Sequence, residues 1–255
     1  MKIMLVGDIM GHGGREIFQK YTKALRQEKG IDLVIVNGEN ASGGRGLSKA
    51  NLAELIGYGA DIITSGNHIW DNKDAFSYLD SEPYVLRPLN YPEGTIGKGM
   101  AIYPYKAREI AVINLMGRVY MPPVDCPFQA VDKVLSGLRA DIVIVDFHAE
   151  ATSEKIAMGH YLTGRATVVV GTHTHVQTAD ERIIDGQTAY LTDLGMTGPY
   201  DSVIGMEKTS IINKFLTGLP CRHEVAKGAC MYSALIVDIG SDNLPKAVER
   251  VLIRE

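Results

Sequence analysis

Five short apolar runs, each followed at once by polar residues, constrain the fold of this chain more than any other feature. They are rich in Ile and Val, as is typical of strands that are covered on both faces. The runs are Ile3–Val6, Leu33–Val36, Ile62–Thr64, Ile142–Val145 and Thr167–Val170. Stretches with a helical pattern lie between them, namely Arg15–Lys29, Ser48–Ile56 with Ser48 as cap, Pro127–Leu138 and Ser153–Leu162. This alternation predicts βαβ crossovers and a largely parallel sheet.

Three other segments have a pattern that favours antiparallel or mixed pairing: Met100–Asn114, Thr188–Leu191 and Met231–Ile239. We therefore expect a layered α/β fold with mixed β-sheets. No repeat or low-complexity tract interrupts the sequence, and 255 residues is near the upper size of one hydrophobic core. We expect a single domain over residues 1–255.

The composition is that of an ordinary globular protein, with 45% hydrophobic and 22% charged residues. A formal net charge of −4 argues against binding of duplex nucleic acid, which needs clustered Lys and Arg. The apolar start of the chain is too short for a signal peptide, and no run approaches the roughly 20 apolar residues of a membrane helix. We expect a cytoplasmic protein with no membrane contact, whose three cysteines are reduced thiols.

Every predicted central strand is followed by side chains that can bind a metal ion. Because ligands bind at the carboxyl ends of the strands in open α/β sheets, we expect these side chains to lie close together. The predicted metal ligands are Asp8, Glu39, Asn40, Asn67, His148, His173 and His175.

Each of these residues has an ordinary explanation when it is taken alone. Asp8 could be a helix cap, His148 a satisfied core histidine, and Asn67 a turn residue. His173 and His175 are more specific, because alternate positions of an extended segment point to one side. Caps and core histidines have no reason to occur together at equivalent strand ends, so the joint pattern predicts a metal centre.

The residue types indicate which metals would fit. Imidazoles combined with carboxylates and carboxamides, with no cysteine nearby, suit Fe, Mn, Zn or Co better than Mg or Ca. Seven ligands are too many for one ion that must also leave room for a substrate. The sequence therefore predicts two divalent ions that share a bridging carboxylate and a bridging hydroxide.

The same motif blocks resemble those of the calcineurin-like metallophosphoesterase superfamily, whose fold is an α-β-β-α sandwich. Three positions depart from the common pattern: Met10 replaces a ligand histidine, Glu39 replaces a bridging Asp, and Ile69 follows Asn-His where an acid is common. The start Met1–Gly11, with the segments Val36–Ala41 and Gly66–Trp70, is similar to the YmdB-like branch of bacterial phosphodiesterases.

This resemblance implies hydrolysis of 2′,3′-cyclic nucleotides such as 2′,3′-cAMP to 3′-nucleotides, two divalent ions that are most often Fe, and a cytoplasmic homo-oligomer, either a dimer or a tetramer. It assigns one ion to Asp8, Glu39, Asn40 and His175, with Asn40 compensating for the histidine missing at Met10. It assigns the other ion to Glu39, Asn67, His148 and His173. Glu39 is then the bridge, and His68 stays unligated.

An unligated histidine beside two ions suggests a mechanism. Two dications lower the pKa of a bridging water, so that hydroxide attacks phosphorus in line. The leaving ribose alkoxide needs a proton, which an imidazolium can supply near neutral pH. We assign this proton-donor role to His68.

Two other classes of protein use similar residues. A metal-dependent amidohydrolase has a His-x-His pair and an Asp, but there the pair comes first and the Asp late, the reverse of Asp8 and His173–His175. A non-catalytic metal-containing regulator that binds a cyclic nucleotide or RNA-processing partners fits the same groups. The unligated His68 favours catalysis over regulation.

The glycine-rich segment Gly11–Arg15 lacks the order of a dinucleotide motif, and the chain has no P-loop, so we expect no nucleotide cofactor there. His12 and Arg15 either help to hold phosphate or cap a helix. Four further residues are expected at the surface, in a core or in an interface rather than in the site, namely Trp70, His160, Tyr200 and His223.

Overall fold

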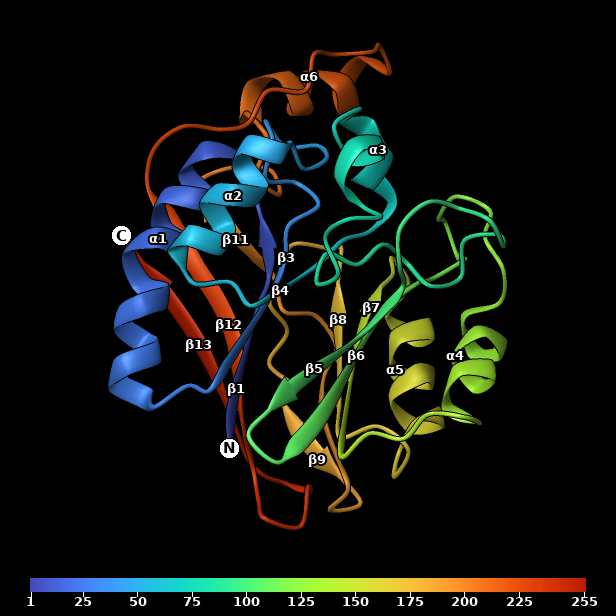
Figure 1. Cartoon of the computed structure of the whole chain (residues 1–255). Coiled ribbons are helices and arrows are strands. Elements are labelled where there is room, and N and C mark those ends of the chain that lie inside the picture. The colour runs from blue at the N-terminus through green and yellow to red at the C-terminus, as the bar shows by residue number, and fades with distance from the viewer.

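The computed structural model describes residues 1–255, which form two mixed β-sheets with helices on their outer faces (Figure 1). The first sheet has the order β2-β11-β12-β1-β3-β4, and β13 pairs with β12. Its strands are β1 (Lys2–Val6), β2 (Asp8–Ile9), β3 (Leu33–Asn37), β4 (Ile62–Thr64), β11 (Met196–Pro199), β12 (Cys230–Ile239) and β13 (Pro245–Arg254). β1, β3 and β4 are parallel neighbours, while β12 runs antiparallel to β1.

The second sheet has the order β5-β6-β7-β8-β10-β9. Its strands are β5 (Met100–Tyr105), β6 (Arg108–Met116), β7 (Ile142–His148), β8 (Val168–Thr172), β9 (Arg182–Ile184) and β10 (Thr188–Leu191). β6, β7, β8 and β10 are parallel, and the outer strands β5 and β9 pair antiparallel. The predicted central strands are therefore confirmed, but they divide between two sheets.

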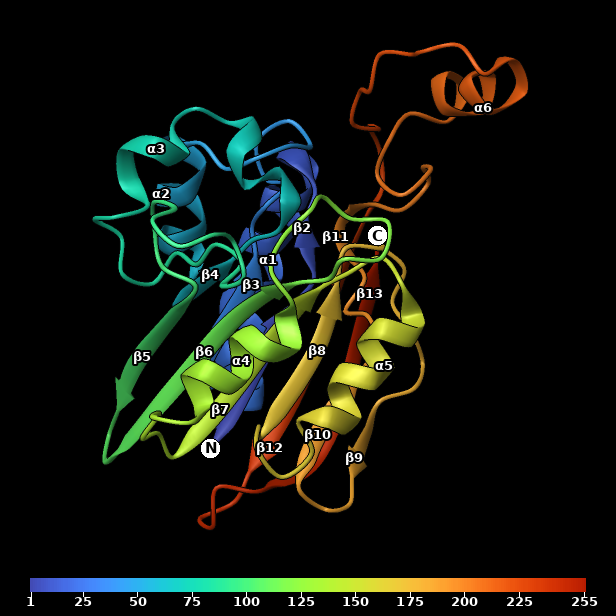
Figure 2. The same ribbon diagram turned by 90° about the vertical axis from the view of Figure 1, so that its right-hand side faces the viewer.

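The chain has six α-helices, and most of them lie on the two outer faces. They are α1 (Gly11–Lys29), α2 (Lys49–Tyr58), α3 (Ala75–Tyr78), α4 (Pro127–Leu135), α5 (Thr152–Tyr161) and α6 (Lys208–Thr217), with a 3-10 helix η1 at Asn67–Asp71. In Figure 2, α1 and α2 lie beside the first sheet, and α4 and α5 cover the second. The predicted layered α/β fold is confirmed.

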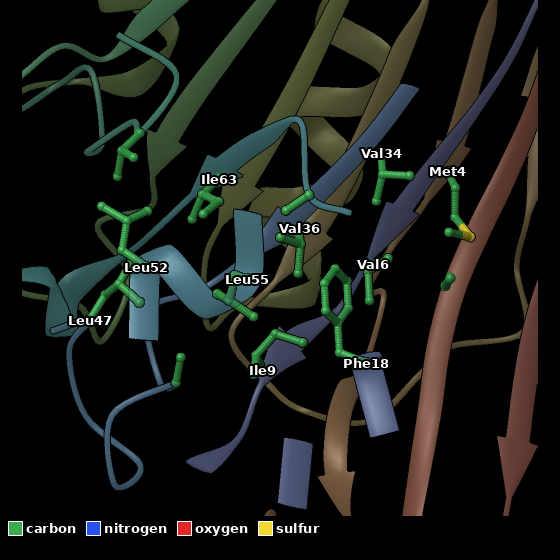
Figure 3. Packing of buried hydrophobic residues seen from close by; sticks show 14 of the residues in the cluster. Met4, Val6, Ile9, Phe18, Val34, Val36, Leu47, Leu52, Leu55 and Ile63 are labelled. Atoms are coloured by element: carbon green, nitrogen blue, oxygen red, sulfur yellow. The ribbon is translucent and has the colours of Figure 1, made fainter. Parts of the chain in front are cut away.

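Alternating side chains of β1 explain this layering. Met4 and Val6 point outward and pack with Phe18 of α1 (Figure 3). Ile3 and Leu5 point the other way, into a buried cluster that contains residues of both sheets. A strand covered on both faces in this way needs an unbroken apolar sequence, which is the pattern that the chain shows.

Local sequence accounts for most element boundaries. Ser48 caps α2 by accepting a hydrogen bond from the Asn51 backbone nitrogen at 3.2 Å, as predicted. α1 was expected to begin at Arg15 but begins at Gly11, since Gly11 has a φ of 61° and turns the chain directly into the helix. β7 continues through His148, three residues beyond its predicted end.

The helix α6 was not predicted. Figures 1 and 2 both show it at the top of the molecule, beyond the end towards which β8 points and away from the two helical layers. The three cysteines are free thiols, as expected. None of the helices has the length and apolar character needed to cross a bilayer.

Candidate metal centre

All seven predicted ligands lie at the carboxyl ends of parallel strands from both sheets. β1, β3 and β4 lead to Asp8, to Glu39 and Asn40, and to Asn67, while β7 and β8 lead to His148, His173 and His175. The loops after these strands meet where the two sheets face each other. Residues from distant parts of the chain are thereby brought into one site.

Glu39, His148 and His173 form the centre of the cluster. One ligand atom from each lies within 4.8 Å of the others, close enough to hold one metal ion. Nε2 of His148 is 3.1 Å from Oε1 of Glu39 and 3.0 Å from Nδ1 of His173. The side-chain oxygen of Asn67 lies 3.1 Å from the same Nε2 atom. Four predicted ligands therefore point at one small volume.

Asn40 and His175 lie on the other side of Glu39. Nδ2 of Asn40 is 3.2 Å from Oε1 of Glu39 and 3.1 Å from Nε2 of His175. Oε1 of Glu39 thus contacts both Asn40 and His148. A carboxylate in this position can bridge two ions.

Asp8 supplies a test of whether the site suits a metal ion. Its side chain is completely buried, and Oδ1 has no hydrogen-bond partner. A buried carboxylate oxygen without a partner is costly unless it coordinates a cation. The space beside Glu39 is also kept open by Gly66, where a Cβ would lie 2.2 Å from His148 Nε2 and 2.3 Å from Glu39 Oε2. The donor set and the open space both fit bound divalent ions.

The buried charges shift one another's protonation. Burial raises the pKa of Glu39, but the adjacent His148 imidazole outweighs this effect and lowers it to about 2. Burial lowers the pKa of His148, but Glu39 and Asp8 raise it to about 9. Burial raises the pKa of Asp8 to about 7 despite His175 and His148. Burial, with His148 nearby, lowers the pKa of His173 to about 3. Without metal, protons take the place of cations in this cluster.

Hydrogen bonds outside the cluster fix which nitrogen each histidine directs inward. Oγ1 of Thr172 donates to Asp146 at 2.7 Å, so it accepts from Nδ1 of His148 at 2.9 Å. Nδ1 of His175 donates to the Ile204 carbonyl at 2.8 Å. Both rings therefore direct Nε2 into the site. Metal-binding histidines in proteins are commonly oriented in this way, by a hydrogen bond from the ring nitrogen that does not bind the metal.

The loop that carries His173 and His175 is strained, because these residues have φ values of 101° and 66°. A buried ion pair holds the loop: Nζ of Lys155 on α5 lies 2.5 Å from Oδ2 of Asp193. Asp193 also accepts hydrogen bonds from the Thr174 hydroxyl at 2.7 Å and the Thr174 backbone nitrogen at 3.2 Å. The strained conformation is thus anchored at the residue between the two histidines.

His68 lies beside the cluster and is partly exposed. Its backbone nitrogen donates to Oε2 of Glu39 at 3.2 Å, which fixes the start of η1 against the site. Its ring nitrogen Nδ1 lies 2.9 Å from Oδ2 of Asp71. The carboxylate orients the imidazole and leaves Nε2 free to act on a ligand.

A pocket of about 470 Å³ opens over the cluster. Glu39, Asn40, His68, His173 and His175 form one part of its lining. This volume lies within the range of about 300 to 1,000 Å³ that is typical of small-molecule sites.

His12, Arg15 and His223 differ in their positions relative to this pocket. His12 is exposed near Glu16, and Arg15 binds Glu54 and the Ala41 carbonyl, so neither lines the pocket. His223 is exposed, as expected for a surface residue, and it also lines the pocket. The segment around His223 contains no motif, so only the folded chain places this residue there.

Several supporting residues were missed by the sequence analysis: Asp71, Glu150, Lys155, Thr172, Thr174 and Asp193. Thr172 and Thr174 lie within the His-x-His segment, where alternation with histidine was an available signal. Nε2 of His173 lies 3.1 Å from Oε2 of Glu150, two residues after His148. Lys155 and Asp193 had no sequence signal, because a lysine in a helix is normally exposed.

Comparisons with known proteins extend over almost the whole chain. The family model described as YmdB-like protein matches residues 4–251. The chain is 48% identical over 259 residues to the 2′,3′-cyclic-nucleotide 2′-phosphodiesterase of Bacillus subtilis (strain 168), covering 100% of this chain and 98% of that protein. A hypothetical protein from Thermus thermophilus has a TM-score of 0.96 at 41% identity, covering 100% of both chains. A novel phosphatase from Mycoplasma pneumoniae has a TM-score of 0.96 at 34% identity, covering 100% of this chain and 93% of that one.

Proposed function

Since the chain belongs to the YmdB-like family, we propose that it is a metal-dependent phosphodiesterase that hydrolyses 2′,3′-cyclic nucleotides to 3′-nucleotides. The similarity to the Bacillus subtilis 2′,3′-cyclic-nucleotide 2′-phosphodiesterase supports the substrate class. The buried Glu39 carboxylate, which contacts ligands on both of its sides, supports the dinuclear site.

We assign two ions to the cluster. One is held by Asp8, Glu39, Asn40 and His175, and the other by Glu39, Asn67, His148 and His173. The contacts of Glu39 with both Asn40 and His148 support its role as the shared ligand. The orphaned Oδ1 of Asp8 supports a cation on its side of the cluster. Mixed imidazole, carboxylate and amide ligands suit Fe, Mn, Zn or Co, and among these the resemblance to the family favours Fe.

When bound, the ions would neutralise the charge of the phosphate oxygens and lower the pKa of a coordinated water, which would make it available as the nucleophile. His68 acts on the opposite side of the reaction, where it donates a proton to the leaving O2′ atom. Asp71 positions the His68 ring through its contact with Nδ1 and thereby directs Nε2 towards the substrate. The P–O2′ bond breaks, a water oxygen is added to phosphorus, and the product keeps its phosphate on O3′.

Elemental analysis of the freshly purified protein, followed by turnover of 2′,3′-cAMP and 3′,5′-cAMP with each reconstituted metal, tests this function. We expect two ions per chain and a 3′-nucleotide product from 2′,3′-cAMP. Tight binding of 2′,3′-cAMP to the metal-loaded protein without turnover would support the regulator instead.

A further inference from the structure

The pocket over the metal centre has a second wall that the proposed hydrolysis does not use. Residues 203–223 and Arg45 form this wall, which faces the ligand loops. It contains apolar side chains, among them Ile204, Met206 and Phe215, and basic ones. We call it the outer wall, and α6 is its main element.

Three basic side chains gather on the outer wall of a protein whose net charge is −4. They are Arg45, Lys214 and His223, and none of them forms a salt bridge or a side-chain hydrogen bond. Desolvation lowers the pKa of His223, and the nearby Lys214 and Arg45 cations lower it further, so the three groups act on one another. Lys208, on the same helix, is instead paired with Asp201 at 2.8 Å. Arg45 and Lys214 therefore offer unpaired positive charge to a ligand on the outer wall.

The same wall offers an aromatic face. Phe215 lines the pocket, yet its side chain is 79% exposed, whereas Ile211 one turn earlier is buried and anchors α6. Exposed aromatic rings beside basic side chains are the usual means of holding single-stranded nucleic acids, where bases stack on the ring and phosphates meet the cations. The outer wall has both parts of such a site.

A cyclic mononucleotide cannot use all of these groups. Its only phosphate is the reacting one, which the metal cluster must hold. In an RNA chain a 2′,3′-cyclic phosphate occupies both O2′ and O3′ of the last residue, so the chain continues only through O5′. The next phosphate and base then lie outside the cluster, and the outer wall lines the same pocket.

We propose that the outer wall binds the nucleotide that precedes the cyclic phosphate, so that short oligoribonucleotides ending in a 2′,3′-cyclic phosphate are preferred over mononucleotides. Phe215 stacks on the preceding base, and Arg45 and Lys214 contact the linking phosphate. The reaction is unchanged: water adds to the terminal phosphorus, the P–O2′ bond breaks, and O2′ takes a proton. This inference rests on the proposed function, and it names the substrate class more closely.

Steady-state kinetics of the metal-loaded protein test it, with 2′,3′-cAMP compared with the adenosine dinucleotide that ends in a 2′,3′-cyclic phosphate. We expect kcat/KM to be about tenfold higher for the dinucleotide, mainly through KM, since stacking of one base on an aromatic ring commonly contributes this much or more. Equal values would overturn this inference and leave the proposed function standing. No turnover of either compound would overturn both.

Two variants locate the effect. In Phe215→Ala and Lys214→Gln, the ratio of kcat/KM for dinucleotide over mononucleotide should fall towards one. Leu216→Ala and Lys208→Gln are the matched controls, because Leu216 is 77% exposed on the same helix and Lys208 is paired, and neither lines the pocket. Both controls should keep the wild-type ratio, and an equal loss in the controls would overturn the assignment.

A binding measurement separates recognition from catalysis. Fluorescence anisotropy with a labelled oligoadenylate that carries a 3′-phosphate should show binding that weakens with salt, and a shallower salt dependence for Lys214→Gln. An exposed Phe215 could instead form a contact between copies of the chain, and light scattering tests this role. If Phe215→Ala lowers the molecular mass while the kinetic ratio stays at the wild-type value, α6 is a contact between copies, and the inference is overturned.

Discussion

Glu39 lies at the centre of the site because its side chain reaches between two groups of ligands. Its carboxylate contacts Asn40 on one side and His148 on the other. Asn40 lies in the loop after β3, and His148 is the last residue of β7. Met10, which stands where the superfamily commonly has a histidine, is buried and packs against Gly198 and Gly205. Asn40 is the side chain that meets His175 instead.

Asn40→Ala should therefore weaken the ion held with Asp8 and His175 before the other ion is affected. We expect metal content to fall from two towards one ion per chain during dialysis, as measured by elemental analysis. Asn67→Ala is the matched control, since it removes an amide ligand from the other side of Glu39. The same order of metal loss in both variants would contradict the assignment of ligands to two sites.

His68→Ala should keep its metal and lose most of its rate, because His68 contacts the cluster only through its backbone nitrogen. General acid catalysis typically contributes about a hundred- to ten-thousandfold, so kcat on 2′,3′-cAMP should fall within this range. An aryl phosphodiester, whose leaving group needs no proton, should be affected much less. His160→Ala, an exposed residue on α5, serves as the control, and full activity of His68→Ala would refute the proton-donor role.

Metal affinity should depend on pH through His148. The pKa of this residue is raised to about 9 in the metal-free protein, so below pH 9 an ion must displace a proton from it. Apparent affinity should rise by up to about tenfold per pH unit from pH 7 to 9 and level off above. Below pH 7, the raised pKa of Asp8 adds a second proton to displace and steepens the dependence. Titration with Mn²⁺ at pH 6, 7, 8 and 9 measures this, and a flat profile would contradict it.

At the scale of elements, the loop after β8 depends on α5. Lys155 is 2% exposed, and its partner Asp193 is fully buried. Asp193 in turn accepts the two hydrogen bonds of Thr174, between the strained His173 and His175. The helix that packs on the second sheet therefore also fixes the geometry of two proposed metal ligands.

Lys155→Met should leave the Asp193 carboxylate buried and unpaired, which costs about 3 to 5 kcal/mol of stability. The double variant Lys155→Met with Asp193→Asn should recover part of this loss, because the uncompensated charge is gone. Urea unfolding of the metal-free proteins measures stability, and Mn²⁺ titration measures the site. If the single variant bound metal like the wild type, the ion pair would have no role in placing the histidines.

At the scale of the whole molecule, the proposed metal centre lies where it would join the two sheets. Glu39 and Asn67 follow strands of the first sheet, and His148 and His173 follow strands of the second. The buried cluster between the sheets is continuous, from which we infer a single domain. The predicted homo-oligomer stays a prediction, which light scattering can test.

Removal of the metal with a chelator should lower the melting temperature, because ligands from both sheets are then no longer tied together. Ions that bind only the folded chain stabilise it by an amount that grows with their concentration over Kd. Calorimetry with increasing Mn²⁺ should show a rising melting temperature in the wild type and a smaller rise in His148→Ala. An unchanged melting temperature after chelation would contradict a metal that links the sheets.

The sequence by itself determined the central strands, most helices and the family, because these depend on local patterns. Ile and Val runs are read from neighbouring residues, and Ser48 caps a helix within a turn of its own position. The candidate ligands followed as well, since strand ends in parallel sheets share one edge.

The strand order within each sheet, the Lys155–Asp193 pair and the position of α6 were decided only by the tertiary structure. Each depends on contacts between segments far apart in the chain, such as the 38 residues between Lys155 and Asp193. A lysine in a helix and a histidine in a loop are both expected at the surface. Packing nevertheless buries Lys155 and places His223 beside the pocket. Local chemistry therefore specified what the site contains, and long-range packing specified what surrounds it.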